Sequence, residues 1–203
     1  MKLPLDVNSV KGFLDADEGT ALYENCIECT RTHPALEVGS YCGKSTVYLG
    51  TACKENDKTL FAVDHHRGSE EHQPGEEYHD TTLFDEQAGL MDSFREFRAT
   101  MRTARLEEHV VPLVASSVAA ARNWSTPLGF VFIDGGHSMQ AALNDYRAWA
   151  GHVVSGGVLA IHDIFPDPDD GGQAPFTIFK MAQDSGLFEV MPMVKTLGML
   201  RRL

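Results

Sequence analysis

The chain has 203 residues, 43% of them hydrophobic and 23% charged, which is ordinary for one globular domain with a sizeable core. Its 17 basic and 29 acidic residues give a formal charge of −12. This balance argues against nucleic acid as a partner, because phosphate backbones are bound by clustered Lys and Arg. No run approaches the ~20 apolar residues of a membrane-spanning helix and no signal-peptide pattern is present, so we expect a cytoplasmic protein without a membrane partner.

The N-terminal third contains a helical region followed by a sharp strand-to-helix turn. Apolar residues near helical spacing predict a helical cap over residues 1–33, in which Asp15–Glu18 can cap a helix. Next come the apolar run Ala35–Val38, Gly39 and Gly43, and a helix-compatible stretch. Glycine permits close backbone approach, and a helix N-terminus favours anions. We therefore expect a ligand carboxylate or phosphate at this turn.

The spacing of the turn excludes two common nucleotide motifs. A P-loop has four residues between its glycines, whereas only three separate Gly39 from Gly43. A dinucleotide fingerprint requires a glycine where Tyr41 stands. What remains is the pattern E-x-G-x-x-x-G-x-S from Glu37 to Ser45.

A second predicted strand, 58–64, ends in Asp64, at a distance from the turn that suits a ribose-binding carboxylate. Any strand can end in an acidic residue, so on its own Asp64 is equally consistent with a ribose ligand and with an ordinary strand end. Residues 65–90 follow, with little apolar periodicity and with His65, His66, His72 and His79. Ligands bind beyond the carboxyl ends of strands in open α/β sheets, so we predict a substrate-covering lid over 65–90.

Strands and helices alternate through the rest of the chain. The expected elements are a helix over 91–105, a strand over 110–115, a helix from Ser116, a strand over 129–134, a helix over 138–149, a strand over 158–163 after the Gly156-Gly157 turn, a helix over 175–185 and a hairpin over 187–203. This alternation predicts a single α/β domain over 1–203, a Rossmann-like parallel sheet with helices on both faces. The hairpin would add an antiparallel edge strand.

Several local patterns together resemble one enzyme family. They are the Glu37–Ser45 turn, F-I-D-G-G-H-S at 132–138, G-G-V-L-A-I-H-D at 156–163 and E-G-x-x-L-Y at 18–23. Their order resembles the Methyltransf_24 group of class I S-adenosylmethionine (SAM) methyltransferases, related to catechol-type and macrocin-type O-methyltransferases. The resemblance covers nearly the whole chain and implies a seven-stranded sheet. It also implies SAM contacts from Glu37, Gly39, Tyr41, Gly43, Ser45, Asp64 and Ser116.

Asp134 and Asp163 close two strands that are neighbours in this fold, so their carboxylates can converge with His162 beside them. Two carboxylates and waters suit Mg²⁺, whereas imidazole favours zinc, manganese or iron. Catechol-type enzymes have Asp followed by Asp-Asn at the metal, and macrocin-type relatives have an acid where this chain has His162. The sequence is therefore consistent both with a metal ion at these residues and with a site that binds none. His137 is a candidate general base, with hydrogen bonding at the helix start as the alternative.

We therefore expect a SAM-dependent O-methyltransferase that acts on a hydroxyl of a small molecule, for example a sugar or glycosylated metabolite, with a divalent cation as a candidate cofactor. Catalysis is assigned to His137 and Asp134, and the cation to Asp134, His162 and Asp163. A homo-oligomer is compatible with the sequence. Two alternatives remain: a nicotinamide-dependent (NAD) oxidoreductase on a Rossmann sheet, and a non-catalytic SAM-fold protein that binds a partner.

Overall fold

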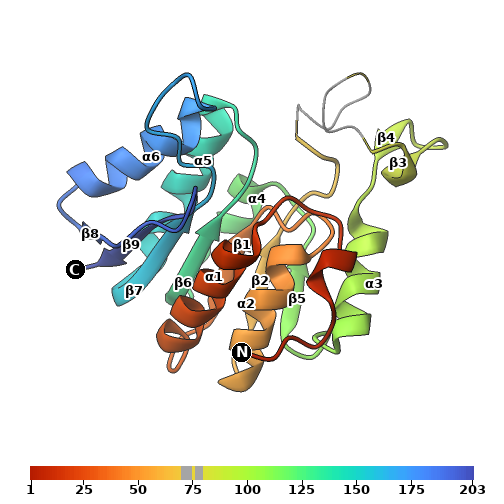
Figure 1. The fold of residues 1–203 in the computed structure, drawn as a ribbon, viewed down its shortest axis with the longest axis horizontal. Coiled ribbons are helices and arrows are strands. Elements are labelled where there is room, and N and C mark those ends of the chain that lie inside the picture. The colour runs from red at the N-terminus through yellow and green to blue at the C-terminus, as the bar shows by residue number, and fades with distance from the viewer. Residues whose placement is uncertain (70–74, 76–79) are drawn as a thin grey trace.

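A computed structural model describes residues 1–69, 75 and 80–203, and its centre is a seven-stranded sheet (Figure 1). The strands run in the order β5-β2-β1-β6-β7-β9-β8. Their bounds are β1 Ala35–Val38, β2 Leu60–Val63, β5 Val110–Leu113, β6 Leu128–Ile133, β7 Val153–Ile161, β8 Phe188–Val190 and β9 Gly198–Arg202. The predicted α/β fold with a seven-stranded class I methyltransferase sheet is confirmed.

Helices cover both faces of the sheet. They are α1 Ala16–Cys29, α2 Lys44–Glu55, α3 Phe94–Ala104, α4 Ser117–Ala121, α5 Met139–Trp149 and α6 Gln173–Asp184, with short 3-10 turns at Val7–Ser9, Thr81–Leu83 and Ala150–His152. Apolar residues of α1, α2 and α3 form one buried cluster with the sheet, and those of α5 and α6 form a second on the opposite face. None of the helices in the described ranges has both the length and the apolar character needed to cross a bilayer.

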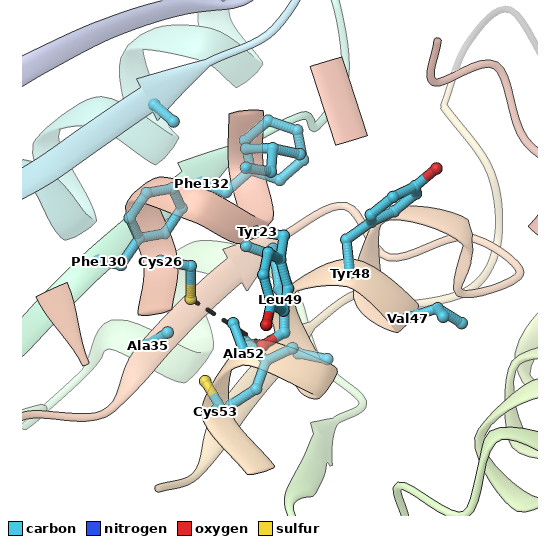
Figure 2. Packing of buried hydrophobic residues seen from close by; sticks show 14 of the residues in the cluster. Tyr23, Cys26, Ala35, Val47, Tyr48, Leu49, Ala52, Cys53, Phe130 and Phe132 are labelled. Carbon is cyan, nitrogen blue, oxygen red and sulfur yellow. Dashed lines mark hydrogen bonds between the residues drawn. The ribbon is translucent and has the colours of Figure 1, made fainter. Parts of the chain in front are cut away.

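The central strand β6 shows why an apolar run forms a buried strand. All six of its residues are buried because both faces of the sheet are covered. Phe130 and Phe132 belong to the cluster beneath α1 and α2, whereas Val131 and Ile133 belong to the cluster beneath α5 and α6. Figure 2 shows Phe130 and Phe132 beside residues of α1 and α2.

Three details differ from the sequence-based expectations. The expected C-terminal hairpin is formed by β8 and β9, but β9, which runs antiparallel to β7, lies between β7 and β8. The edge strand is therefore β8. The glycines at 156–157 lie inside β7, where the register with β6 shifts, instead of forming a turn before it. The predicted lid contains a small antiparallel ribbon of β3 (Phe84–Asp85) and β4 (Leu90–Met91). His72 and His79 lie outside the described residues.

The N-terminal region is helical over only part of the range 1–33, because residues 10–15 form no helix. Asp15 and Glu18 form a capping box at the start of α1, and a separate 3-10 turn precedes the helix. All four cysteines are free, and Cys26 lies in the core with its thiol directed at the Leu49 carbonyl (Figure 2).

Candidate active site

A cavity of about 920 Å³ opens at the carboxyl ends of the parallel strands. Residues that follow β1, β2, β5, β6 and β7 line it, together with the segment before α1. The chain leaves β1 toward β2 on one side and later returns to β6 on the other, so the cavity lies at the switch point where open α/β sheets bind ligands. Nine residues predicted for the site line it: Gly39, Tyr41, Ser45, Asp64, Ser116, Asp134, His137, His162 and Asp163.

The glycine turn approaches the end of β6 very closely. Gly39 has φ +85°, and a Cβ added there would lie 2.0 Å from the Asp134 carbonyl oxygen. Only glycine fits this position. Gly43 has φ +93° and begins α2 without a side-chain cap. Lys44 and Ser45 of the first turn line the cavity, so the positive end of α2 lies at the crevice, where an anion is favoured.

Glu37 lies behind the turn and not among the residues that line the cavity. Its carboxyl group is fully buried and accepts hydrogen bonds from the hydroxyls of Ser45 and Thr46, both at 2.6 Å. Burial raises the pKa of Glu37 to about 8, although the two hydroxyls oppose this rise. Glu37 therefore fixes the start of α2 to β1. Its partner Ser45 lines the cavity, so Glu37 positions a residue of the site without lining the cavity itself. Gly43 also shapes the turn without lining the cavity.

Asp64 ties the end of β2 to the glycine turn. Its Oδ2 accepts hydrogen bonds from the backbone N–H groups of Ser40 at 3.0 Å and Tyr41 at 2.8 Å, and its Oδ1 accepts from the His66 N–H at 2.7 Å. Each carboxylate oxygen has two lone pairs, so Oδ1 can accept one further hydrogen bond, for example from a ribose hydroxyl. The Ser40 hydroxyl is buried at the cavity wall, and no partner for it lies within the described ranges. It is a polar group that a ligand can satisfy.

The structure brings Asp134, His162 and Asp163 together, so that one ligand atom from each lies within 4.8 Å of the others. The His162 Nδ1 atom is 3.1 Å from an Asp134 oxygen and 3.5 Å from an Asp163 oxygen. The other ring nitrogen, Nε2, is 2.9 Å from Glu18 Oε2. Burial disfavours the imidazolium, but the surrounding carboxylates, Asp134 foremost, hold the pKa of His162 far above its usual value.

This donor set fits a divalent cation. The carboxylates of Asp134 and Asp163 converge with Nδ1 of His162. The carboxylate of Glu18 contacts the other ring nitrogen, Nε2. Histidine ligands in metal sites are oriented by such a partner. Asp163 has φ +57°, a conformation that non-glycine residues adopt at a cost and that functional sites often retain.

His137 and Asp163 form a second pair beside this cluster. His137 Nε2 lies 3.0 Å from Asp163 Oδ2, and the His137 side chain is 38% exposed at the cavity. Burial opposes ionisation of Asp163, but His137 and His162 hold its pKa well below the usual range. A carboxylate that orients an imidazole at a cavity wall is an arrangement typical of general bases.

Two functional candidates were missed from the sequence. Glu18 contacts His162 across 144 positions, and only the E-G-x-x-L-Y pattern drew attention to it. Asp145 of α5 is buried at the cavity wall, and burial raises its pKa to about 6. Its Oδ2 would lie 2.5 Å from a Cβ on Gly135, so it packs tightly under the loop after β6.

Residues 36–164 match the model of the Methyltransf_24 family, a methyltransferase domain. The chain belongs to this family. The matched region runs from β1 past the end of β7 and includes all of the predicted site residues. The protein is therefore a SAM-dependent methyltransferase, and the oxidoreductase alternative is wrong.

Solved structures show the same fold at low sequence identity. The O-methyltransferase NovP aligns with a TM-score of 0.69 at 16% identity, over 92% of this chain and 79% of NovP. An O-methyltransferase from Bacillus cereus, solved with S-adenosylhomocysteine, gives 0.63 at 15% identity over 96% and 85%. TomG from Streptomyces achromogenes, solved with SAM, gives 0.64 at 13% identity over 94% and 81%.

Proposed function

We propose that this methyltransferase moves the methyl group of SAM to a hydroxyl of a small molecule, with His137 as the base. The observation that carries the proposal is the His137–Asp163 pair at 3.0 Å, directly beside the Asp134–His162 contact at 3.1 Å and within the same cavity as the glycine turn. A base and a candidate cation site at one wall suit an acceptor whose proton must be removed.

Cofactor binding follows from the turn and the strand ends. The methionine carboxylate binds at the N-terminus of α2, beside Ser45 and the buried Ser40 hydroxyl. A ribose hydroxyl binds Asp64 Oδ1, and the adenine lies against Ser116. Tyr41 and Gly39 shape the wall, and Glu37 and Gly43 position the turn from behind. The cofactor methyl group is then directed toward Asp134.

Methyl transfer from a sulfonium is an in-line displacement, so the chain must orient the acceptor oxygen and accept its proton. Asp163 fixes the His137 ring, and the proton of the acceptor hydroxyl passes to a His137 ring nitrogen. Asp134, His162 and Asp163 would hold a divalent cation, which when bound stabilises negative charge on oxygen. The positive φ of Asp163 keeps its carboxylate between the two imidazoles.

The acceptor class is a hydroxylated small molecule, with sugars and glycosylated metabolites as the first candidates. The carboxylates of Asp134 and Asp163 and the imidazoles of His137 and His162 lie together at the cavity, and such groups suit an acceptor with several hydroxyls. NovP, the Bacillus cereus enzyme and TomG are themselves O-methyltransferases, which supports oxygen as the methylated atom.

The test uses SAM with a labelled methyl group and a panel of sugars, glycosides, phenols and amines. We expect label in an O-methyl product and a loss in kcat of roughly 10²–10³-fold for His137→Gln. His109→Gln, just before β5 at the opposite end of the sheet, is the matched control and should retain activity. Label found only on nitrogen, or an unchanged kcat in His137→Gln, would show that the proposal is wrong. No transfer to any acceptor would favour a binding protein without catalysis.

A further inference from the structure

A buried contact connects the N-terminal helix to the candidate cation site. Glu18 lies in the first turn of α1, is 3% exposed and falls outside the residues matched by the family. Its Oε2 is 2.9 Å from His162 Nε2. Its Oε1 accepts hydrogen bonds from the backbone N–H of Thr196 at 2.9 Å and from the Thr196 hydroxyl at 2.8 Å. Both carboxylate oxygens of Glu18 are therefore held in place.

These contacts determine which nitrogen of His162 faces the cavity. The Thr196 backbone N–H can only donate, so Oε1 must be an acceptor, and Oε2 is then directed at the imidazole. With Oε2 accepting the Nε2 proton, Nδ1 is the nitrogen directed at Asp134 and Asp163. Next to these carboxylates Nδ1 carries a proton as well, and once that proton is displaced its lone pair is oriented as a metal ligand, in a ring that a carboxylate holds on the far side.

We propose that Glu18 is a positioning residue that makes His162 a nitrogen ligand, and that the site thereby selects a first-row transition metal such as Mn²⁺ over Mg²⁺. This inference rests on the cation site of the proposed function. Mg²⁺ prefers an all-oxygen octahedral shell, whereas imidazole ligands raise the relative affinity for transition metals. The two carboxylates keep enough oxygen character for Mn²⁺.

A Glu18→Gln substitution separates positioning from simple packing. Oε1 accepts from the Thr196 N–H at 2.9 Å and from its hydroxyl at 2.8 Å, whereas the Asp15 N–H of the capping box contacts Oε2 at the longer distance of 3.3 Å. The amide oxygen of glutamine is therefore expected at Thr196, and the amide NH₂ faces His162 Nε2. The NH₂ group then donates to Nε2, so the ring proton remains on Nδ1, where it blocks the metal-facing nitrogen. The substitution also removes the capping-box acceptor for the Asp15 N–H, so a purely structural role for Glu18 predicts a loss of stability with little change in metal affinity.

The experiment titrates the purified full chain with Mn²⁺ alone, followed by electron paramagnetic resonance of the free ion, and with Mg²⁺ as a competitor. We expect Mn²⁺ to bind wild type at least ~10-fold more tightly than Mg²⁺, and Glu18→Gln to weaken Mn²⁺ by roughly 10–100-fold. Glu24→Gln, an exposed position on the same helix, should bind Mn²⁺ as wild type does. His162→Asn, which replaces the nitrogen with an amide oxygen, should lose the preference for Mn²⁺.

Unchanged Mn²⁺ affinity in Glu18→Gln, or equal affinity of wild type for both ions, would overturn the inference. The same holds if wild type binds neither ion yet transfers methyl groups, an outcome that leaves the proposed O-methyl transfer intact. Conversely, the expected Mn²⁺ binding without any transfer to a hydroxyl would overturn the proposed function and support the role of Glu18.

Discussion

Glu37→Gln tests whether burial raises the pKa of the Glu37 carboxyl group, behind the cofactor turn, and so makes stability depend on pH. Glu37 is completely buried, and both of its oxygens contact hydroxyls that can donate or accept. Glutamine has the same shape and can satisfy both hydroxyls, so the substitution removes the charge with little change in packing.

The magnitude follows from the pKa of Glu37, which burial raises from 4.5 to about 8. Below pH 4.5 both folded and unfolded states are protonated, and the group has no effect on stability. Between pH 4.5 and about 8 the unfolded state ionises first, so wild type loses about 1.4 kcal/mol of stability for each pH unit. Above that range the loss of wild-type stability levels off at about 5 kcal/mol. Glu37→Gln has no ionisable group at this position, so it does not show this loss.

The assay is urea unfolding of ligand-free protein at pH 5 and pH 8, with Glu107→Gln as an exposed control. The difference in unfolding free energy between Glu37→Gln and wild type should shift by about 4 kcal/mol in favour of the variant between the two pH values. The exposed control should follow wild type. Parallel pH profiles for wild type and Glu37→Gln would refute the reasoning, because they would mean that Glu37 titrates normally in the folded protein.

Three further substitutions probe the site and its support. Gly39→Ala should abolish stable folding or SAM binding, since its Cβ would lie 2.0 Å from the Asp134 carbonyl oxygen; an alanine variant that melts and binds as wild type does would disprove this close approach. Asp64→Asn should weaken SAM by at least about tenfold in calorimetry because ribose hydroxyls prefer a charged acceptor, and unaltered affinity would remove Asp64 from the cofactor site. Trp149→Phe loses the 2.7 Å hydrogen bond from Nε1 to Ser117. It should cost about 1–3 kcal/mol in urea unfolding, and a smaller change would mean that water replaces the bond.

Much of the fold and part of the site could be predicted from the sequence, for identifiable reasons. The apolar run of β6 reads as a strand because both of its faces are buried. Asp134, His162 and Asp163 could be expected to meet because they follow neighbouring strands, and the structure brings them together. The role of His137 and the cofactor contacts are predictions that the substitutions and titrations proposed here test.

Other features depend on packing that local patterns do not encode. Glu18 reaches His162 only because α1 lies beside the end of β7, and no spacing rule connects positions 144 residues apart. Glu37 lies behind the turn because β1 is buried on both faces, which its short sequence did not reveal. The ribbon of β3 and β4 has two residues in each strand, too few for an alternating pattern.

The most direct test of the central claim is a calorimetric titration of the full chain with SAM and, separately, with NAD. We expect saturable heat with SAM at one site per chain, displacement by S-adenosylhomocysteine, and no heat with NAD. Heat with NAD alone, or SAM binding that is unaffected by Asp64→Asn and Gly39→Ala, would contradict the assignment of the crevice between the glycine turn and Asp64 to the cofactor.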